Sequence, residues 1–295
     1  MMRIILFLAT NLAVVLVASL TLNLLGVGSY MTSQGLDYNN LLIFCFIFGM
    51  AGSVISLLLS KFMAKRSMGV QIIENPQNAE QQWLFNTVKE LANKANIGVP
   101  EVGVFNSAQA NAFATGWNKN KALVAVSTGL LNKMNREEVK AVLGHEIGHV
   151  ANGDMITLTL IQGVVNAFVM FFARIIGNFV DKAIFKNENG HGMGFFIATF
   201  VAEIVLGILA STIVFWFSRR REYRADIAGA ELVNPAAMVS ALARLKVESG
   251  QPSEMPSEMV AFGISGELKN KLGGLFMSHP PLDQRIAALK QRYSV

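Results

Sequence analysis

The amino-acid sequence predicts a mainly α-helical integral membrane protein, in which four transmembrane helices carry a water-soluble α+β portion with a small β-hairpin. Three observations lead to this fold class. Apolar residues make up 52% of the 295 residues and charged residues only 15%, whereas about a quarter of a typical soluble domain is charged. Four apolar stretches are long enough to cross a bilayer, which takes about 20 helical residues. A long polar segment separates the second stretch from the third.

The apolar stretches define the predicted domain organisation. They cover residues 4–25, 40–60, 156–180 and 194–217. The first begins after Arg3, as a signal peptide does, but its apolar run exceeds the usual roughly 7–15 residues, so we interpret it as an uncleaved anchor. We therefore predict a transmembrane hairpin, a soluble block, a second transmembrane hairpin and a second soluble block, over residues 1–60, 61–155, 156–217 and 218–295.

Basic residues predict the orientation of these hairpins. No lysine or arginine occurs between residues 26 and 39, and the loop between the third and fourth stretches carries only Lys182 and Lys186. Basic residues are more frequent after the second and fourth stretches, at Lys61, Lys65, Arg66, Arg219, Arg220, Arg221 and Arg224. Because short basic loops tend to stay in the cytoplasm, we expect both chain termini and both soluble blocks on the cytoplasmic side.

Residue spacing predicts the elements of the first soluble block. Residues 80–95 carry apolar side chains at helical spacing on one face. Short strands are predicted at 101–105, 110–115 and 121–127. The turn at 116–120 joins the last two strands and predicts a hairpin. Asn135 can cap a following helix with Glu138 as its third residue, a capping-box pattern, and we expect this helix to run through His149.

The second soluble block is predicted to be helical. The helix of the fourth apolar stretch continues to about residue 230. Asn234 and Pro235 are typical of a helix start, and the helix that follows should end near residue 247. A Pro-Pro pair precedes a last helix over residues 282–292.

Composition also limits the function classes. Cys45 is the lone cysteine, so no disulfide can form within the chain. The basic residues are not gathered into a stripe of the kind that binds nucleic acid, and we expect no nucleic-acid partner. The expected surroundings are instead a lipid bilayer, because of the four apolar stretches.

Two of the four histidines lie in the stretch VLGHEIGHVANGD, residues 142–154. His145 and His149 are four residues apart, so on a helix their rings lie on one face, one turn apart. This separation suits two ligands of a tetrahedral zinc site, with Glu146 beside the open coordination position. The alternative is a pair of surface histidines on an amphipathic helix. A chance H-E-x-x-H has a frequency on the order of 0.3% at this histidine and glutamate content, which favours the metal site.

A catalytic zinc site needs a further protein ligand, and Glu222 in the stretch SRRREYRADIAGAEL is the candidate. Asp226 lies four residues later on the same helical face, where it can accept the second ring N–H of a ligand histidine. Two predicted spans separate His149 from Glu222, so both lie on the same side of the membrane. Their distances from these spans place the metal roughly 7–11 Å from the apolar layer. The alternative is an ordinary helix face with Arg–Glu pairs.

Four motifs, NAFATG, HEIGHVANGD, EYRAD and SHPPLDQRI, occur with two spans before them and two between them. Together they resemble the HtpX-type membrane zinc metalloproteases, which are related to the CAAX prenyl endopeptidases, and the resemblance covers nearly the whole chain. It implies a zincin-like protease domain, one zinc ion per chain and endopeptidase activity. It further implies the cytoplasmic membrane of a bacterium, and quality control of misfolded or damaged membrane proteins under stress.

The resemblance assigns roles to the motif residues. His145, His149 and Glu222 are expected to hold zinc, and Glu146 to take a proton from the attacking water and deliver it to the leaving amine. His279 and Arg285, in the stretch SHPPLDQRI that the family keeps, are candidates for stabilising the oxyanion. The alternative for His279 is a loop histidine before a Pro-Pro turn.

Three further groups are expected around this site. Asp154 and Asn152 follow the motif helix and are expected to brace its end, with a solvated turn as the alternative. An edge strand that pairs with extended substrate backbone is predicted at Asn111, Ala112, Phe113 and Ala114. The alternative is a plain hairpin strand. Because backbone pairing tolerates many side chains, we expect protein substrates of broad sequence, membrane proteins among them.

Two other function classes are consistent with parts of the sequence. One is a membrane-anchored zinc protein that binds partners, as a chaperone does, without cutting them; Glu146 argues against it, because a structural site needs no base. The other is a small transporter, suggested by Arg174 and Glu203 inside the third and fourth spans. The large soluble portion argues against transport, and we expect these two charges to pair with each other.

Overall fold

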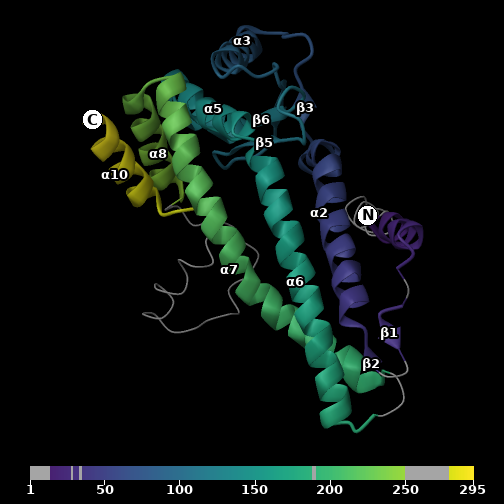
Figure 1. Ribbon diagram of the computed structural model, residues 1–295. Coiled ribbons are helices and arrows are strands. Elements are labelled where there is room, and N and C mark those ends of the chain that lie inside the picture. Colours follow the sequence, from purple (N-terminus) through teal and green to yellow (C-terminus); the bar gives the residue numbers. More distant parts are fainter. Residues whose placement is uncertain (1–13, 28, 33–34, 188–190, 250–278) are drawn as a thin grey trace. The chain divides into compact units, whose positions relative to one another are not determined.

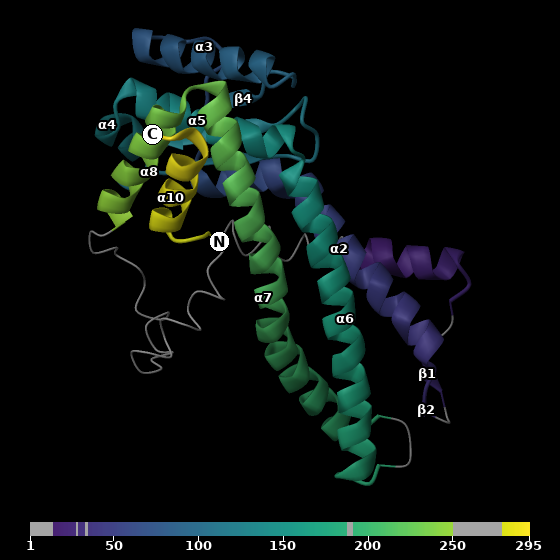
Figure 2. The ribbon, with the colours of Figure 1, turned by 60° about the vertical axis from the view of Figure 1, so that its left-hand side comes forward.

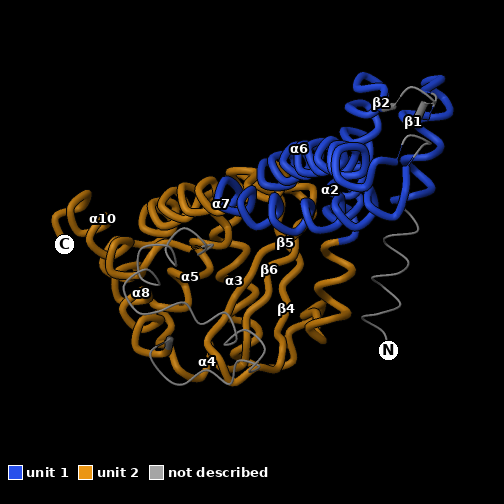
Figure 3. The backbone as a smooth tube through the Cα atoms, turned by 90° about the horizontal axis from the view of Figure 1, so that it is seen from below, with its two compact units in different colours: residues 1–59, 157–214 blue, residues 60–156, 215–295 orange. Residues whose placement is uncertain are grey.

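The structure is a computed structural model that describes residues 14–27, 29–32, 35–187, 191–249 and 279–295 (Figure 1). The chain divides into two compact units, which Figure 3 shows in different colours. Unit 1 comprises residues 1–59 and 157–214, and unit 2 comprises residues 60–156 and 215–295. Each unit therefore combines segments that are far apart in the sequence.

Three long helices supply most of unit 1. They are α2 (Tyr38–Met68), α6 (Asp154–Ala183) and α7 (Met193–Leu232). Among the described residues, these three helices are long and apolar enough to cross a membrane, with mean hydropathy of 2.5, 1.9 and 2.2 over their most apolar 18 residues. Only 11–22% of the residues in these windows are buried inside the protein. Most of their apolar side chains therefore point outward, as lipid-facing side chains do.

The predicted stretches at 40–60, 156–180 and 194–217 lie inside these helices. The first predicted span, 4–25, is described only in part, because residues 1–13 lie outside the described residues. Its described part is an apolar helix over Val14–Leu24, which by itself is shorter than a span. A fourth crossing therefore stays a prediction. Two short strands, β1 (Met31–Thr32) and β2 (Gly35–Leu36), pair antiparallel before α2.

Small residues and one ion pair join the helices of unit 1. A Cβ atom on Gly49 of α2 would lie 2.7 Å from the carbonyl oxygen of Gly163 on α6, so the two backbones meet directly. Close contacts of this kind between small residues are common between membrane helices. Arg174 Nη1 of α6 lies 3.0 Å from Glu203 Oε1 of α7. The predicted pairing of these two charges is confirmed. Neither residue therefore offers the unpaired charge that would have supported the transporter hypothesis.

Unit 2 contains a four-stranded sheet of order β3–β4–β6–β5. The strands are β3 (Gln71–Ile72), β4 (Glu101–Phe105), β5 (Ala112–Thr115) and β6 (Leu123–Ser127). β5 and β6 pair antiparallel, which confirms the predicted hairpin, while β4 pairs parallel to β6. β3 is too short for an alternation pattern and was not predicted. This order leaves β5 at one edge of the sheet.

Helices surround this sheet. They are α3 (Ala79–Lys94), α4 (Thr128–Lys133), α5 (Arg136–Ala151), α8 (Pro235–Ser249) and α10 (Leu282–Tyr293). All but α4 begin and end within two residues of the predicted positions. α4 was missed because it has only six residues, although Ser127 caps it by accepting a hydrogen bond from the Leu130 amide. Figure 2 shows α8 and α10 next to each other beside the last turns of α7.

The motif helix α5 lies in the core of unit 2. Asn135 and Glu138 form the predicted capping box at its start, with hydrogen bonds of 2.9 and 3.0 Å. The helix packs against α3, α8 and β5. Val139, Leu143 and Ile147 of this helix are at most 2% exposed. Because neighbours cover several of its faces, α5 can hold its polar motif residues in fixed positions.

Candidate metal and catalytic site

The site begins where α5 crosses the last turns of α7 at a very short distance. A Cβ atom on Gly148 of α5 would lie 2.6 Å from Cβ of Ala228, and a Cβ atom on Gly229 would lie 3.1 Å from the amide nitrogen of His145. Side chains larger than hydrogen would hold the two helices apart at these points. Gly148 inside the motif thus allows a close approach of the two helices, and carboxylates of α7 can reach the rings of α5.

At this crossing the three predicted metal ligands converge. His145 Nε2 and His149 Nε2 lie 3.2 Å apart. Glu222 brings Oε1 to 3.3 Å from His149 Nε2 and Oε2 to 3.6 Å from His145 Nε2. One ligand atom from each of the three residues lies within 4.8 Å of the others. All three side chains are nearly buried, with exposed fractions of 3–12%.

Each of the two rings also contacts an aspartate carboxylate through its Nδ1 atom. Asp226 Oδ1 lies 3.0 Å from His145 Nδ1, the contact that the spacing of Glu222 and Asp226 predicts. Asp154 Oδ2 lies 2.7 Å from His149 Nδ1. The proton is assigned to each Nδ1 from these contacts, because a carboxylate can only accept it. Both Nε2 atoms then point toward Glu222, where they can bind a proton or a metal ion.

Asp154 was expected around the metal ligands, and the structure shows which of them it contacts. We expected Asp154 to brace the end of the motif helix, whereas its carboxylate contacts the ring of His149. The chain turns back at Gly153, which has φ +68°, and this reversal places Asp154 beside the helix that precedes it. Asn152 is exposed at the C-cap of α5, and its backbone N–H donates to the carbonyl oxygen of Gly148. The solvated-turn alternative therefore describes the Asn152 side chain.

The electrostatics of this centre favour a cation. Burial lowers the pKa of His149, but its hydrogen bonds to Asp154 and Glu222 outweigh burial and raise the pKa to about 9. Burial raises the pKa of the Glu222 carboxyl, yet hydrogen bonds from His149 and His279 hold it far below the usual range. Both pKa directions mean that positive charge is stabilised between His149 Nε2 and Glu222, where a metal ion can take the place of the proton. The donor set therefore fits a divalent metal ion.

Arg285 belongs to the site, but its contacts differ from those of a free oxyanion donor. Its Nε and Nη2 donate to the two carboxylate oxygens of Asp226 at 2.8 and 2.6 Å. Its Nη1 lies 3.2 Å from Glu222 Oε2. The guanidinium is buried, and a bidentate contact of this kind fixes both partners. These contacts favour a role in positioning Glu222 and Asp226, while the oxyanion role of Arg285 stays a prediction.

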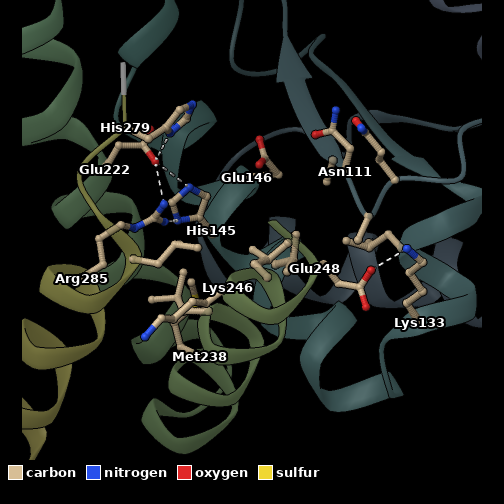
Figure 4. Close-up of a pocket in the computed structure, with 18 of the residues that line it drawn as sticks. Asn111, Lys133, His145, Glu146, Glu222, Met238, Lys246, Glu248, His279 and Arg285 are labelled. Atoms are coloured by element: carbon tan, nitrogen blue, oxygen red, sulfur yellow. Dashed lines mark hydrogen bonds and ion pairs between the residues drawn. The ribbon is translucent and has the colours of Figure 1, made fainter. Parts of the chain in front are cut away.

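His279 and Glu146 face the open side of the site. His279 Nδ1 lies 2.8 Å from Glu222 Oε2, and its side chain is 63% exposed. Glu146 is half-buried, and Figure 4 shows its carboxylate in the pocket between the His145–Glu222 group and Asn111. Tyr223 directs its hydroxyl toward Gln284 Oε1 at 3.4 Å. Glu146 therefore remains available to a molecule in the pocket.

Sequence reasoning missed one buried residue next to the centre. Arg221 is 9% exposed, and its Nη1 donates to the backbone carbonyl oxygen of Asp154 at 2.9 Å. Its Nη2 donates to Ser218 Oγ at 3.2 Å. The sequence had placed Arg221 only among the charges that set membrane orientation. In the structure, Arg221 links α7 to the backbone of Asp154, whose carboxylate contacts the His149 ring.

A cleft of about 940 Å³ opens beside the metal ligands. β5 and the loop before it form one wall through Asn111 and Ala112, and α8 forms another. Two of the four residues predicted for substrate pairing thus line the cleft at the edge of the sheet. Phe113 continues the strand and its ring lies 5.5 Å from that of Phe105. Ala114 also belongs to β5, where it pairs with Val124 of β6.

We predict that Gly148→Ala destabilises the protein, because the new methyl group would lie too close to Ala228. Overpacking of this kind costs about 1–3 kcal/mol. The helices must separate to relieve it, so we expect a lower melting temperature together with weaker metal binding. Gly207→Ala in α7 is the control, since a Cβ atom there meets nothing within 4 Å. A Gly148→Ala protein with an unchanged melting temperature and metal affinity would show that the close crossing is not required.

Comparisons with known proteins agree with this geometry. The family model for peptidase family M48 matches residues 78–293. The chain is 65% identical over 294 residues to the Protease HtpX of Pseudomonas putida (strain W619), covering 99% of this chain and 100% of that protein. It is 64% identical over 289 residues to the Protease HtpX of Hahella chejuensis (strain KCTC 2396), covering 98% and 99% of the two chains.

The fold is similar to a solved structure, the crystal structure of S. mikatae Ste24p, with a TM-score of 0.61. The match covers 84% of this chain and 58% of that chain, at 17% sequence identity. A likeness at this low identity concerns the fold alone. The shared fold is mostly helical and contains a small mixed sheet.

Proposed function

Since this chain belongs to peptidase family M48 and is a membrane metalloprotease, we propose that it is a zinc-dependent endopeptidase of the bacterial inner membrane. We further propose that it cleaves misfolded or damaged membrane proteins on the cytoplasmic side. The observation that carries this proposal is the meeting of His145, His149 and Glu222 beside a cleft that Glu146 enters.

The proposed zinc ligands are His145, His149 and Glu222, one ion per chain. Two imidazole nitrogens and one carboxylate are a ligand set of catalytic zinc sites, which keep a further position open. Bound zinc polarises the scissile carbonyl group and lowers the pKa of a water molecule. Asp226 and Asp154 contact the Nδ1 atoms of the two rings, so that the Nε2 atoms face the proposed zinc position. Such contacts to ligand histidines strengthen metal binding.

Glu146 is the proposed proton carrier. It follows His145 directly in α5, and its carboxylate lies in the cleft without being a member of the ligand group. It accepts a proton from the attacking water and delivers it to the amine of the leaving peptide, as general bases do in peptide hydrolysis. His279, exposed at the rim of the cleft beside Glu222, is the proposed donor to the oxyanion.

The position of β5 at the edge of the sheet favours unfolded segments as substrates. Its free edge can add an extended segment as a further strand, with hydrogen bonds from backbone to backbone. Folded proteins already use these backbone groups internally, so only unfolded segments can pair in this way. Asp154 begins α6 and Glu222 belongs to α7, so the chain runs from the site into two apolar helices without a break. This continuity supports substrates that lie close to the membrane.

We expect the full-length protein, purified in detergent, to contain about one zinc ion per chain and to cleave unfolded casein. A strong chelator should remove the zinc and abolish cleavage, because without the metal the pKa of the attacking water stays too high for Glu146 to deprotonate it readily. Added zinc should restore both. Metal analysis and gel assays of the same samples measure the two quantities.

Two outcomes would contradict the proposal. Cleavage that continues after the metal has been removed would exclude a metal-dependent mechanism. Zinc-loaded protein that binds casein but never cuts it would favour the alternative, a zinc-stabilised binding or chaperone protein. The position of Glu146 in the open cleft argues against that alternative, because a purely structural metal site has no use for a base there.

A further inference from the structure

One turn of unit 2 lies beside the point where a membrane helix enters this unit. The turn covers residues 116–121 and connects β5 to β6. Lys61 of α2 directly follows the predicted span 40–60, and its Nζ donates to the carbonyl oxygen of Lys121 at 2.8 Å. A lysine at the end of a span reaches into the headgroup layer of the bilayer. The hydrogen bond from Lys61 therefore places one end of the turn at the level of the lipid headgroups.

The backbone of this turn is held by several contacts. Asn118 accepts two hydrogen bonds, one at Oδ1 from the backbone N–H of Asn120 at 2.8 Å and one at its carbonyl oxygen from that of Lys121 at 3.0 Å. Asn120 Oδ1 in turn accepts from the backbone N–H of Gly98 at 2.8 Å. A Cβ atom on Gly98 would lie 2.6 Å from the carbonyl oxygen of Asn120, so the two backbones meet directly. These contacts fix the backbone on both sides of the turn.

The exposed side chains on and beside the turn are apolar or basic. Trp117 is 51% exposed, and Lys119 and Lys121 are exposed as well. Phe62 and Val99, which follow the two residues that contact the turn, are 57% and 40% exposed. Single exposed apolar residues are ordinary on protein surfaces. A tryptophan with two lysines at the end of a span is instead the combination that membrane proteins place at the headgroup level.

The positive charge of the turn is not balanced by the acidic residue that begins β4. This residue is Glu101, and β4 pairs with β6 directly after the turn. The Glu101 carboxylate forms ion pairs with Lys61, at 2.9 Å, and with Lys65. Two lysines of α2 thus already neutralise it. Lys119 and Lys121 add two further positive charges, which attract the negative surface of a membrane that contains anionic phospholipids.

We propose that this turn is a membrane-contact site, at which Trp117 lies among the phospholipid headgroups and Lys119 and Lys121 contact the phosphates of anionic phospholipids. The occupant is the bilayer surface rather than a second protein, because α2 leads from Lys61 directly into the bilayer. The indole ring suits this layer, since its apolar face and its N–H group meet apolar and polar surroundings together.

This contact places the free edge of β5 along the membrane surface. Thr115 ends β5 at the turn, and Ala112 begins it at the cleft, roughly 10 Å away at the usual rise per strand residue. The cleft end also lies close to a membrane helix, because Asp154 begins α6 and contacts the His149 ring. The site therefore favours unfolded segments that adjoin a membrane span. This substrate class rests on the proposed function, whereas the lipid contact does not.

Fluorescence quenching by lipid tests the contact without any measurement of activity. Full-length, zinc-loaded protein with Trp83→Phe and Trp216→Phe retains Trp117 as its one tryptophan. It is reconstituted into vesicles of phosphatidylcholine and phosphatidylglycerol, with or without bromine atoms on the acyl chains near the headgroups. We expect brominated lipid to remove most of the Trp117 emission. Equal emission in the two kinds of vesicle would overturn the proposal and assign the turn to water or to a protein partner.

The matched control retains Trp83 instead, through Trp117→Phe and Trp216→Phe. Trp83 belongs to α3, packs against the hydrophobic core of unit 2 and lies under the guanidinium of Arg136. Its emission should be the same in both kinds of vesicle. Equal quenching of Trp83 and Trp117 would contradict a specific contact at the turn. If the variant that retains Trp117 loses its zinc, the drop in quenching from wild type to Trp117→Phe decides instead.

The lysines are tested in the same protein. Quenching of Trp117 should be stronger in the mixed vesicles than in vesicles of phosphatidylcholine alone, because the lysines draw the turn toward anionic headgroups. Lys119→Gln together with Lys121→Gln should remove this difference. Equal quenching in both vesicle types before the substitution would contradict the assignment of anionic phospholipids.

The consequence for substrates is tested with Trp117→Glu, which puts a negative charge among anionic headgroups. In vesicles, cleavage of an unfolded segment joined to a membrane span should fall several-fold, while cleavage of casein in detergent should stay at the wild-type rate. Val247→Glu is the matched control, because Val247 is also exposed, at 62%, but lies on α8. It should keep both activities.

The outcomes separate this inference from the proposed function. Zinc-loaded Trp117→Glu that loses both activities would give the turn a role in catalysis rather than in membrane contact. Unchanged cleavage of the membrane-anchored segment would overturn the substrate class. Wild-type protein that cuts nothing contradicts the proposed function and the substrate class, and the quenching of Trp117 still decides the lipid contact.

Discussion

Replacing Glu146 with glutamine is expected to abolish cleavage of unfolded protein while zinc stays bound. Glutamine has the shape of glutamate, but its amide cannot take up the proton of the attacking water. Removing a general base typically lowers a rate by about 10²–10⁴-fold, and each tenfold loss corresponds to about 1.4 kcal/mol of transition-state stabilisation. Metal content should not change, because Glu146 is not a member of the ligand group.

Rates of casein cleavage and metal analysis of the same preparation test this prediction. Glu137→Gln is the matched control, since Glu137 lies on α5 as well but is exposed. It should cleave at the wild-type rate. Wild-type activity in Glu146→Gln would show that another group carries the proton. Loss of zinc from this variant would mean instead that Glu146 helps to bind the metal.

The second large effect is expected from Glu222→Gln, which should lose both zinc and activity. The substitution removes the only carboxylate in the ligand group and the negative charge that balances the cation. It also weakens the contact with the buried Arg285 Nη1, which lies 3.2 Å from Glu222 Oε2. Loss of an outer contact to a ligand weakens metal binding about 10–100-fold, so loss of a direct ligand should weaken it by more than about 100-fold.

Zinc affinity is measured by competition with a chromogenic chelator, so this test does not depend on activity. The control is Glu231→Gln, at an exposed position later in α7, where the carboxylate contacts Tyr293 and Arg292. Its zinc affinity should equal that of the wild type. If Glu222→Gln binds zinc as tightly as the wild type, Glu222 is not the third ligand, and the site must be assigned to other residues.

The two carboxylates behind the histidines link the centre to the rest of unit 2. Asp226 is held by two hydrogen bonds from Arg285 of α10, and the carbonyl of Asp154 is held by Arg221 of α7. Each ring of the ligand pair is therefore oriented by a residue that is itself fixed by a buried arginine. Burial lowers the pKa of Arg221, and the nearby carboxylates of Asp154 and Glu222 offset part of this lowering. These contacts fix the orientation of both rings.

Sequence alone determined the features that depend on neighbouring residues. Apolar length indicated the helices at 40–60, 156–180 and 194–217, because a helix in a bilayer must be apolar over most of its length. The capping box of Asn135 and Glu138 and the hairpin of β5 and β6 likewise follow from residue types at short spacing. The motif spacing also selected His145 and His149, since residues four apart share a helix face, and the need for a further ligand led to Glu222 in the stretch SRRREYRADIAGAEL.

Only the tertiary structure decided which partners these residues meet. Asp154 turned out to hold the His149 ring because the chain reverses at Gly153, and Arg285 contacts two carboxylates about 60 residues earlier in the sequence. α8 packs against α5, and no local pattern encodes that contact. Periodicity fixes which face of a helix is polar or apolar. Which faces then meet depends on the packing of side chains at the helix crossing, where Gly148 and Gly229 allow the closest approach.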